Sequence, residues 1–126
     1  MIDDFFKSVI DMDRAPIVIC DTDHIILYMN PSAVRRYMKS GGEKLVGTSV
    51  LECHNERSNG IINRVLDWFR ESTDNNMIYS YKNEKENKDV YIVALRDDKK
   101  NLIGYYEKHE FRDPESAGLY DFEKSL

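Results

Sequence analysis

Hydrophobic and polar residues follow two different periods along this chain. Residues 2–12 place apolar side chains at the spacing of one helical face, with two acids in the first turn, where the helix dipole favours them. Short apolar runs at 17–20 and 25–29, separated by the polar turn 21–24, are typical of a β-hairpin. The pattern therefore predicts an amphipathic N-terminal helix followed by two antiparallel strands.

Asn30-Pro31 is the clearest local signal for the start of a helix. An Asn side chain accepts from the free amides of a first turn, and Pro has the backbone angle of the first helical position. The helix is expected to end at Gly41-Gly42, because glycine readily adopts the conformation that closes a helix. The longest helix is expected over residues 58–72, where an apolar stripe faces polar residues. That stripe consists of Ile61, Ile62, Val65, Leu66 and Phe69.

The second half of the chain predicts three strands, over residues 77–81, 90–95 and 102–106, with the last extending towards Phe111. Strands at both ends of the chain and helices between them imply an α+β fold, with helices packed on one face of an antiparallel sheet. The space between such a sheet and its helices is a natural place for a small-molecule cavity.

Composition and charge limit the classes of function. A chain of 126 residues suffices for one domain, and a hydrophobic content of 41% is too high for a disordered protein. The net charge of −5 argues against a nucleic-acid partner. The two cysteines form neither a disulfide framework nor a zinc set, the acidic start is not a secretion signal, and no apolar run could span a bilayer. We expect a cytoplasmic protein with no membrane partner.

Three local motifs, in the order of elements given above, resemble those of a PAS domain, a sensory module common in bacterial signalling. They are Cys20-Asp21-x-Asp23-x-Ile25, Asn30-Pro31-x-Ala33 and Glu43-x-Leu45-x-Gly47. The resemblance implies a stand-alone PAS domain with a five-stranded antiparallel sheet over residues 15–111, an N-terminal amphipathic helix within 1–14 and a C-terminal tail over 112–126. His24 departs from the family pattern, which usually has Gly in the first hairpin turn. If that turn requires a positive φ, His adopts it at some cost.

The resemblance also implies a sensory or ligand-binding function without catalytic activity. The long helix would form one wall of a ligand cavity and the sheet the other. Only every second residue of a strand faces inward, so the sequence leaves the register of the sheet wall open. The expected ligand-binding residues are His54, Ile61, Ile62, Val65, Leu66, Phe69, Tyr79, Tyr91, Val93, Ile103 and Tyr105.

His54 is the candidate metal ligand. The segment from Gly47 to Cys53-His54 is similar to that of a PAS subgroup with a Gly…Cys-His segment before the long helix. PAS domains that bind haem use a histidine from the helical side of the cavity, so His54 could be an axial ligand; a structural histidine is the simpler interpretation. A covalent flavin is not expected, because Cys53 lies too late after Gly47 to match the adduct-forming cysteine of light-sensing PAS domains.

The N-terminal helix has more apolar surface than a small domain easily absorbs. We expect a homodimer, with intramolecular packing of the helix as the alternative, and the expected contacts are Phe5, Phe6, Val9 and Ile10. The chain contains no nucleophile elbow, His-Glu-x-x-His motif or phosphate-binding loop. The expected partners are a small molecule, a second copy and a signalling protein. A haem-based gas or redox sensor and a ligand-free interaction domain are the alternatives.

Overall fold

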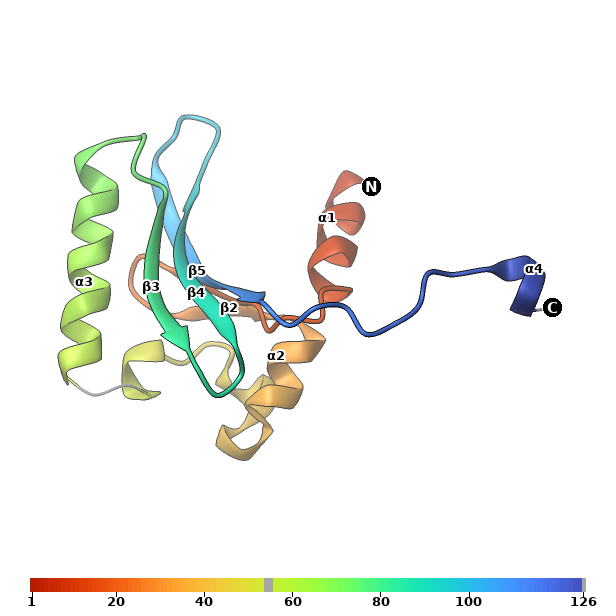
Figure 1. Ribbon diagram of the computed structural model, residues 1–126. Helices are drawn as coiled ribbons and strands as arrows, with labels where there is room; N and C mark the ends of the chain where they lie inside the picture. The colour runs from red at the N-terminus through yellow and green to blue at the C-terminus, as the bar shows by residue number, and fades with distance from the viewer. Residues whose placement is uncertain (54–55, 126) are drawn as a thin grey trace.

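A computed structural model describes residues 1–53 and 56–125 and contains a five-stranded antiparallel sheet in the order β2-β1-β5-β4-β3 (Figure 1). The elements along the chain are α1 (Ile2–Asp11), β1 (Val18–Asp21), β2 (Ile26–Met29), α2 (Pro31–Arg36), the 3₁₀ turns η1 (Met38–Ser40), η2 (Gly42–Leu45) and η3 (Val50–Cys53), α3 (Glu56–Glu71), β3 (Met77–Asn83), β4 (Lys88–Arg96), β5 (Leu102–Phe111) and α4 (Phe122–Ser125). The predicted α+β class, the five strands and the N-terminal helix are confirmed.

Asn30 begins α2 as its sequence context predicts. Its side-chain oxygen accepts from the Ala33 amide at 2.9 Å, and Pro31 occupies the first helical position. The helix is shorter than predicted and ends at Arg36. The chain then continues through η1 to Gly41, whose φ is 125°. The short α2 and the 3₁₀ turns bring this segment back towards the sheet.

The core lies between the sheet and α3. Val65, Leu66 and Phe69 of α3 are buried, each burial being worth roughly 1.5–3 kcal/mol. They pack against residues from the sheet and from α2, namely Cys20, Ile26, Met29, Ala33, Ile92 and Tyr105. Figure 1 shows α3 along one face of the sheet, and α2 with the 3₁₀ turns at one end of that face.

Strand pairing decides which side chains face this core. Ile92 of β4 pairs with Glu107 of β5, and Val90 pairs with His109. We call the face on which these four residues lie the inner face. Gly104 allows β1 and β5 to approach closely, since a Cβ at this position would lie 2.1 Å from the Cys20 carbonyl oxygen.

Two terminal segments extend from the sheet (Figure 1). Helix α1 has no buried residue, the tail that leads to α4 exposes Leu119 and Tyr120, and α4 itself exposes Phe122. The end of α1 is held near β2, because the Tyr28 hydroxyl donates to the Asp11 carboxylate. Across the described residues, no helix combines the length and apolarity needed to cross a membrane.

Candidate functional site

A cavity of about 240 Å³ lies between the inner face of the sheet and the segment from α2 to α3. Its apolar lining comes from Pro16, Val18, Cys20, Ile26, Met29, Leu45, Val50, Ile62 and Ile92. Its polar lining comes from Tyr37, Ser40, Tyr105, Glu107 and His109. A mainly apolar cavity with a few polar groups is typical of a small-molecule site.

Glu107 and His109 form the polar end of this cavity, on one face of β5. The His109 side chain is 4% exposed, and its Nε2 lies 3.8 Å from a Glu107 carboxylate oxygen. The other ring nitrogen, Nδ1, is buried and has no hydrogen-bond partner within residues 1–53 and 56–125. Burial, together with the Lys88 and Arg36 cations, lowers the pKa of His109 to about 4. The imidazole is therefore neutral at pH 7.

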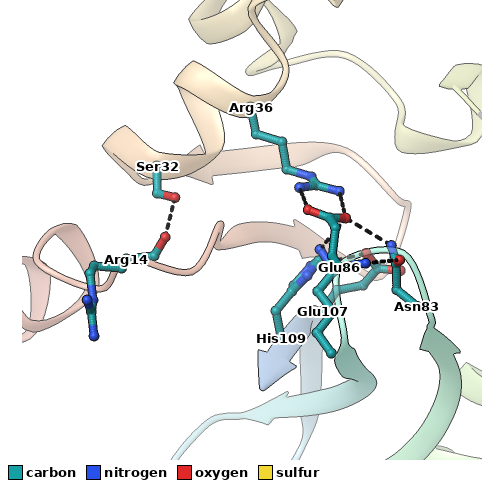
Figure 2. A network of polar contacts seen from close by, with 8 residues as sticks. Arg14, Ser32, Arg36, Asn83, Glu86, Glu107 and His109 are labelled. Carbon is teal, nitrogen blue, oxygen red and sulfur yellow. Dashed lines mark hydrogen bonds and ion pairs between the residues drawn. The ribbon is translucent and has the colours of Figure 1, made fainter. Parts of the chain in front are cut away.

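An ion-pair network lies next to the polar end and joins α2 to the turn between β3 and β4. Figure 2 shows the Arg36 guanidinium meeting the Glu86 carboxylate through two parallel hydrogen bonds, of 2.7 and 2.8 Å. Lys88, whose side chain is fully buried, has its Nζ 3.2 Å from Glu86. The hydrogen bond from Arg36 is the main cause that lowers the pKa of Glu86 to about 2. The network thus holds α2 and the turn together beside the cavity.

His24 is a buried polar residue whose role the sequence did not predict. Its φ of 67° shows that the hairpin turn does require the left-handed conformation at this position. Its Nε2 lies 2.8 Å from Asn63 Oδ1, which can only accept, so Nδ1 accepts from the Tyr105 hydroxyl at 2.8 Å. His24 therefore joins the turn to α3 and orients a phenol that lines the cavity. The signal in the sequence for a special role was that His24 stands where PAS domains usually have Gly.

Cys20 lies at the Tyr105 end of the cavity and is a neutral thiol. Burial raises its pKa to about 11, so the nucleophilic thiolate is scarce at neutral pH. Within the described ranges, no group of three or more His, Cys, Asp and Glu side chains is arranged to hold a metal ion.

The predicted cavity residues of the long helix occupy three kinds of position. Ile62 lines the cavity, whereas Val65, Leu66 and Phe69 lie in the core. Ile61 is 46% exposed and lies on the side of α3 near Trp68 and Ile78, away from this cavity. His54 lies outside the described residues, so its role as a haem ligand stays a prediction.

Of the strand residues predicted to line the cavity, one does so and the others lie elsewhere. Tyr105 lines the cavity. Tyr91 and Val93 are the strand neighbours of Ile92, so they face the opposite side of the sheet; Tyr79 pairs with Tyr91 and is 55% exposed. Ile103 is half-exposed and does not line the cavity. The sequence left the register of the sheet wall open, because alternation alone cannot tell which face of a strand is covered.

Glu107 and His109 were missed as cavity residues. The signal was present in the alternation Tyr105, Glu107, His109, which places all three on one face once β5 is recognised as extending to Phe111. The sequence predicted a strand that continues towards Phe111, but of these three residues only Tyr105 was assigned to the cavity.

No family model matches the sequence, and no curated protein matches it. Solved structures do match. A C-terminal domain from Streptococcus mutans is 19% identical, with a TM-score of 0.65 over 86% of this chain and 84% of that chain. A PAS domain from Colwellia psychrerythraea is 14% identical, with a TM-score of 0.63 over 89% and 98%. A sensory box sensor histidine kinase from Vibrio cholerae is 13% identical, with a TM-score of 0.58 over 85% and 89%. These likenesses confirm the fold that the sequence motifs implied.

Proposed function

We propose that this chain, which has the PAS fold, is a sensory module that binds a small molecule in its cavity and passes the result on through protein contacts. The observation that supports the proposal is the cavity itself, apolar over most of its lining and polar at the β5 end. The proposal assigns no catalytic activity to the chain.

The cavity volume limits the size of the ligand. At about 30 Å³ for each water molecule in the liquid, 240 Å³ corresponds to roughly eight waters. A ligand of this size, such as a single-ring or fused two-ring compound, would be enclosed by residues from α3, the 3₁₀ turns and the four strands β1, β2, β4 and β5. Such a ligand changes signalling only if it binds two arrangements of these elements with different affinity.

Thermal unfolding in the presence of a library of small compounds tests the binding function. A compound that binds only the folded state raises the melting temperature, because binding adds to the free energy of unfolding. The Val50→Phe variant fills the cavity, and it is expected to abolish the shift. Val46→Phe is the matched control, since Val46 is exposed and does not line the cavity.

The outcomes of this experiment distinguish binding in the cavity from binding elsewhere and from a ligand-free interaction domain. A shift that Val50→Phe removes and Val46→Phe retains supports binding in the cavity. A shift that both variants retain places the binding site elsewhere on the chain. If no compound shifts the wild-type protein, the small-molecule proposal fails and the ligand-free interaction domain takes its place.

A second copy is the proposed partner of α1. Phe5, Phe6 and Val9 are each more than 60% exposed and lie on one amphipathic helix. A contiguous apolar surface of this kind marks an interaction site. Ile10 differs from the other three because it is partly buried, and its carbonyl accepts from the Asn30 side chain. The dimer contact is therefore centred on the two phenylalanines.

Haem binding is the alternative that the sequence left open. Absorption spectra of the protein with added haem, for the wild type and for His54→Ala, distinguish it from the proposal above. A sharp Soret band that the substitution shifts or removes would favour the haem sensor. A broad spectrum identical in the two proteins would exclude His54 as the ligand.

A further inference from the structure

We propose that the ligand is an uncharged small molecule whose N–H or O–H donors bind Glu107 and His109 at the polar end of the cavity. This inference rests on the proposed function, because it names the class of ligand for the same site. Three features of the β5 end support it: a carboxylate that can only accept, an imidazole nitrogen without a partner, and a balance of the surrounding charges.

Glu107 supplies the first acceptor. Among the described residues that line the cavity it alone is acidic, and 39% of its side chain is exposed. Its charge acts across the cavity on Tyr37, whose pKa is raised first by burial and then by Glu107. An ionised carboxylate has no proton to donate, so a ligand that meets it must bring one.

His109 supplies the second acceptor. We assign the proton of the neutral ring to Nε2, which lies 3.8 Å from a Glu107 carboxylate oxygen, and this assignment leaves the lone pair on Nδ1. Because Nδ1 is buried and lacks a hydrogen-bond partner among the described residues, it incurs a desolvation cost, which a ligand donor that reaches this nitrogen would offset. Both polar groups at this end of the cavity therefore accept hydrogen bonds.

The surrounding charges favour a ligand without charge. Arg36 and Lys88 carry two positive charges near His109, and Glu86 and Glu107 carry two negative ones. Figure 2 shows Arg36, Glu86 and Glu107 around His109. A cationic ligand bound at Glu107 would be repelled by Arg36 and Lys88. An anionic ligand would be repelled by Glu107 itself. An uncharged donor avoids both repulsions.

Binding of two isosteric probes to the full chain tests the proposal. Indole and benzofuran have the same shape and the same number of non-hydrogen atoms, but only indole carries an N–H. Protein-observed NMR titrations give the dissociation constant of each probe. Indole is expected to bind wild-type protein about tenfold more tightly than benzofuran, as one hydrogen bond to a charged group implies. Protonated benzylamine is expected to bind more weakly than indole.

Two substitutions locate the effect. Glu107→Met keeps the length of the side chain and removes the carboxylate, and His109→Phe removes both ring nitrogens; each is expected to reduce the preference for indole at least threefold. Glu110→Met is the matched control, because Glu110 lies on the opposite face of β5, where it binds Arg112. The control is expected to retain the wild-type preference. Since Glu107 is partly exposed, its variant should fold even if His109→Phe does not.

The outcomes separate this inference from the proposed function. Equal binding of indole and benzofuran, or a preference that Glu107→Met leaves unchanged, overturns the donor inference while small-molecule binding stands. Tighter binding of benzylamine overturns the requirement for an uncharged ligand. Absence of binding by both probes also overturns the donor inference, and the thermal library with Val50→Phe then decides the proposed function independently.

Discussion

Asn30 provides the sharpest test of how this fold is held together. Its side chain is fully buried and makes contacts beyond the helix cap. The oxygen accepts from the amides of Ala33 and Ile17, each at 2.9 Å, and the amide group donates to the carbonyls of Ile10 and Ala15, each at 3.0 Å. One side chain therefore joins α1, the entry to β1 and the start of α2.

The cost of Asn30→Ala can be worked out from these bonds. Loss of the helix cap costs about 1 kcal/mol. The Ile17 amide and the Ala15 carbonyl also lose a partner, and each buried polar group without a partner costs about 1–3 kcal/mol. We therefore expect a loss of about 3–7 kcal/mol, a large share of the roughly 5–15 kcal/mol that stabilises a typical domain.

Urea denaturation of Asn30→Ala, Asn30→Ser and Asn101→Ala measures these contributions. Serine keeps an acceptor for the Ala33 amide but lacks the donating amide group, so it is expected to recover only about 1 kcal/mol. Asn101→Ala is the control, because the Asn101 side chain is exposed and bonds only Asp97 in the described chain; a change within about 0.5 kcal/mol is expected. Wild-type stability in Asn30→Ser, or a loss of only 1 kcal/mol in Asn30→Ala, would refute the reasoning.

Three further predictions concern α1, the hairpin turn and the polar end of the cavity. Replacing Phe5 and Phe6 together by Ser should give a folded monomer in sedimentation velocity, whereas Met38→Ser, which changes an exposed side chain outside α1, should leave a dimer; an unaltered dimer in the double variant would place the interface elsewhere. His24→Gly should be about 1 kcal/mol more stable than His24→Ala, because both lose the ring hydrogen bonds but only Gly adopts a φ of 67° without strain; equal melting temperatures would show that the turn is unstrained. Between pH 6.5 and about 4 the unfolded chain binds a proton at His109 that the folded chain does not, so the free energy of unfolding should fall as the pH falls through this window, and fall less in His109→Gln; identical pH slopes would contradict the lowered pKa.

Local signals in the sequence determined the elements and the fold class. Asn30-Pro31 begins a helix because the cap and the fixed φ act within a few residues, and no distant contact is needed to start it. The apolar runs of the five strands and the stripe of α3 likewise follow from local periodicity. The order of these elements then sufficed for the PAS fold, which the solved structures confirm.

Tertiary structure decided which residues form the cavity. Period-two alternation marks two faces on each strand but does not say which one α3 covers, so Tyr91 and Ile92 were equivalent in the sequence. The packing of α3 resolves this, since Ile92 lies in the core with Leu66 and Phe69. Pairing of β4 with β5 then places Glu107 on the same face. The polar end needs β5, the turn at Glu86 and α2 to meet, and the contact between Arg36 and Glu86 spans 50 residues. Contacts across such separations depend on how the elements pack together, which no local pattern of residues encodes.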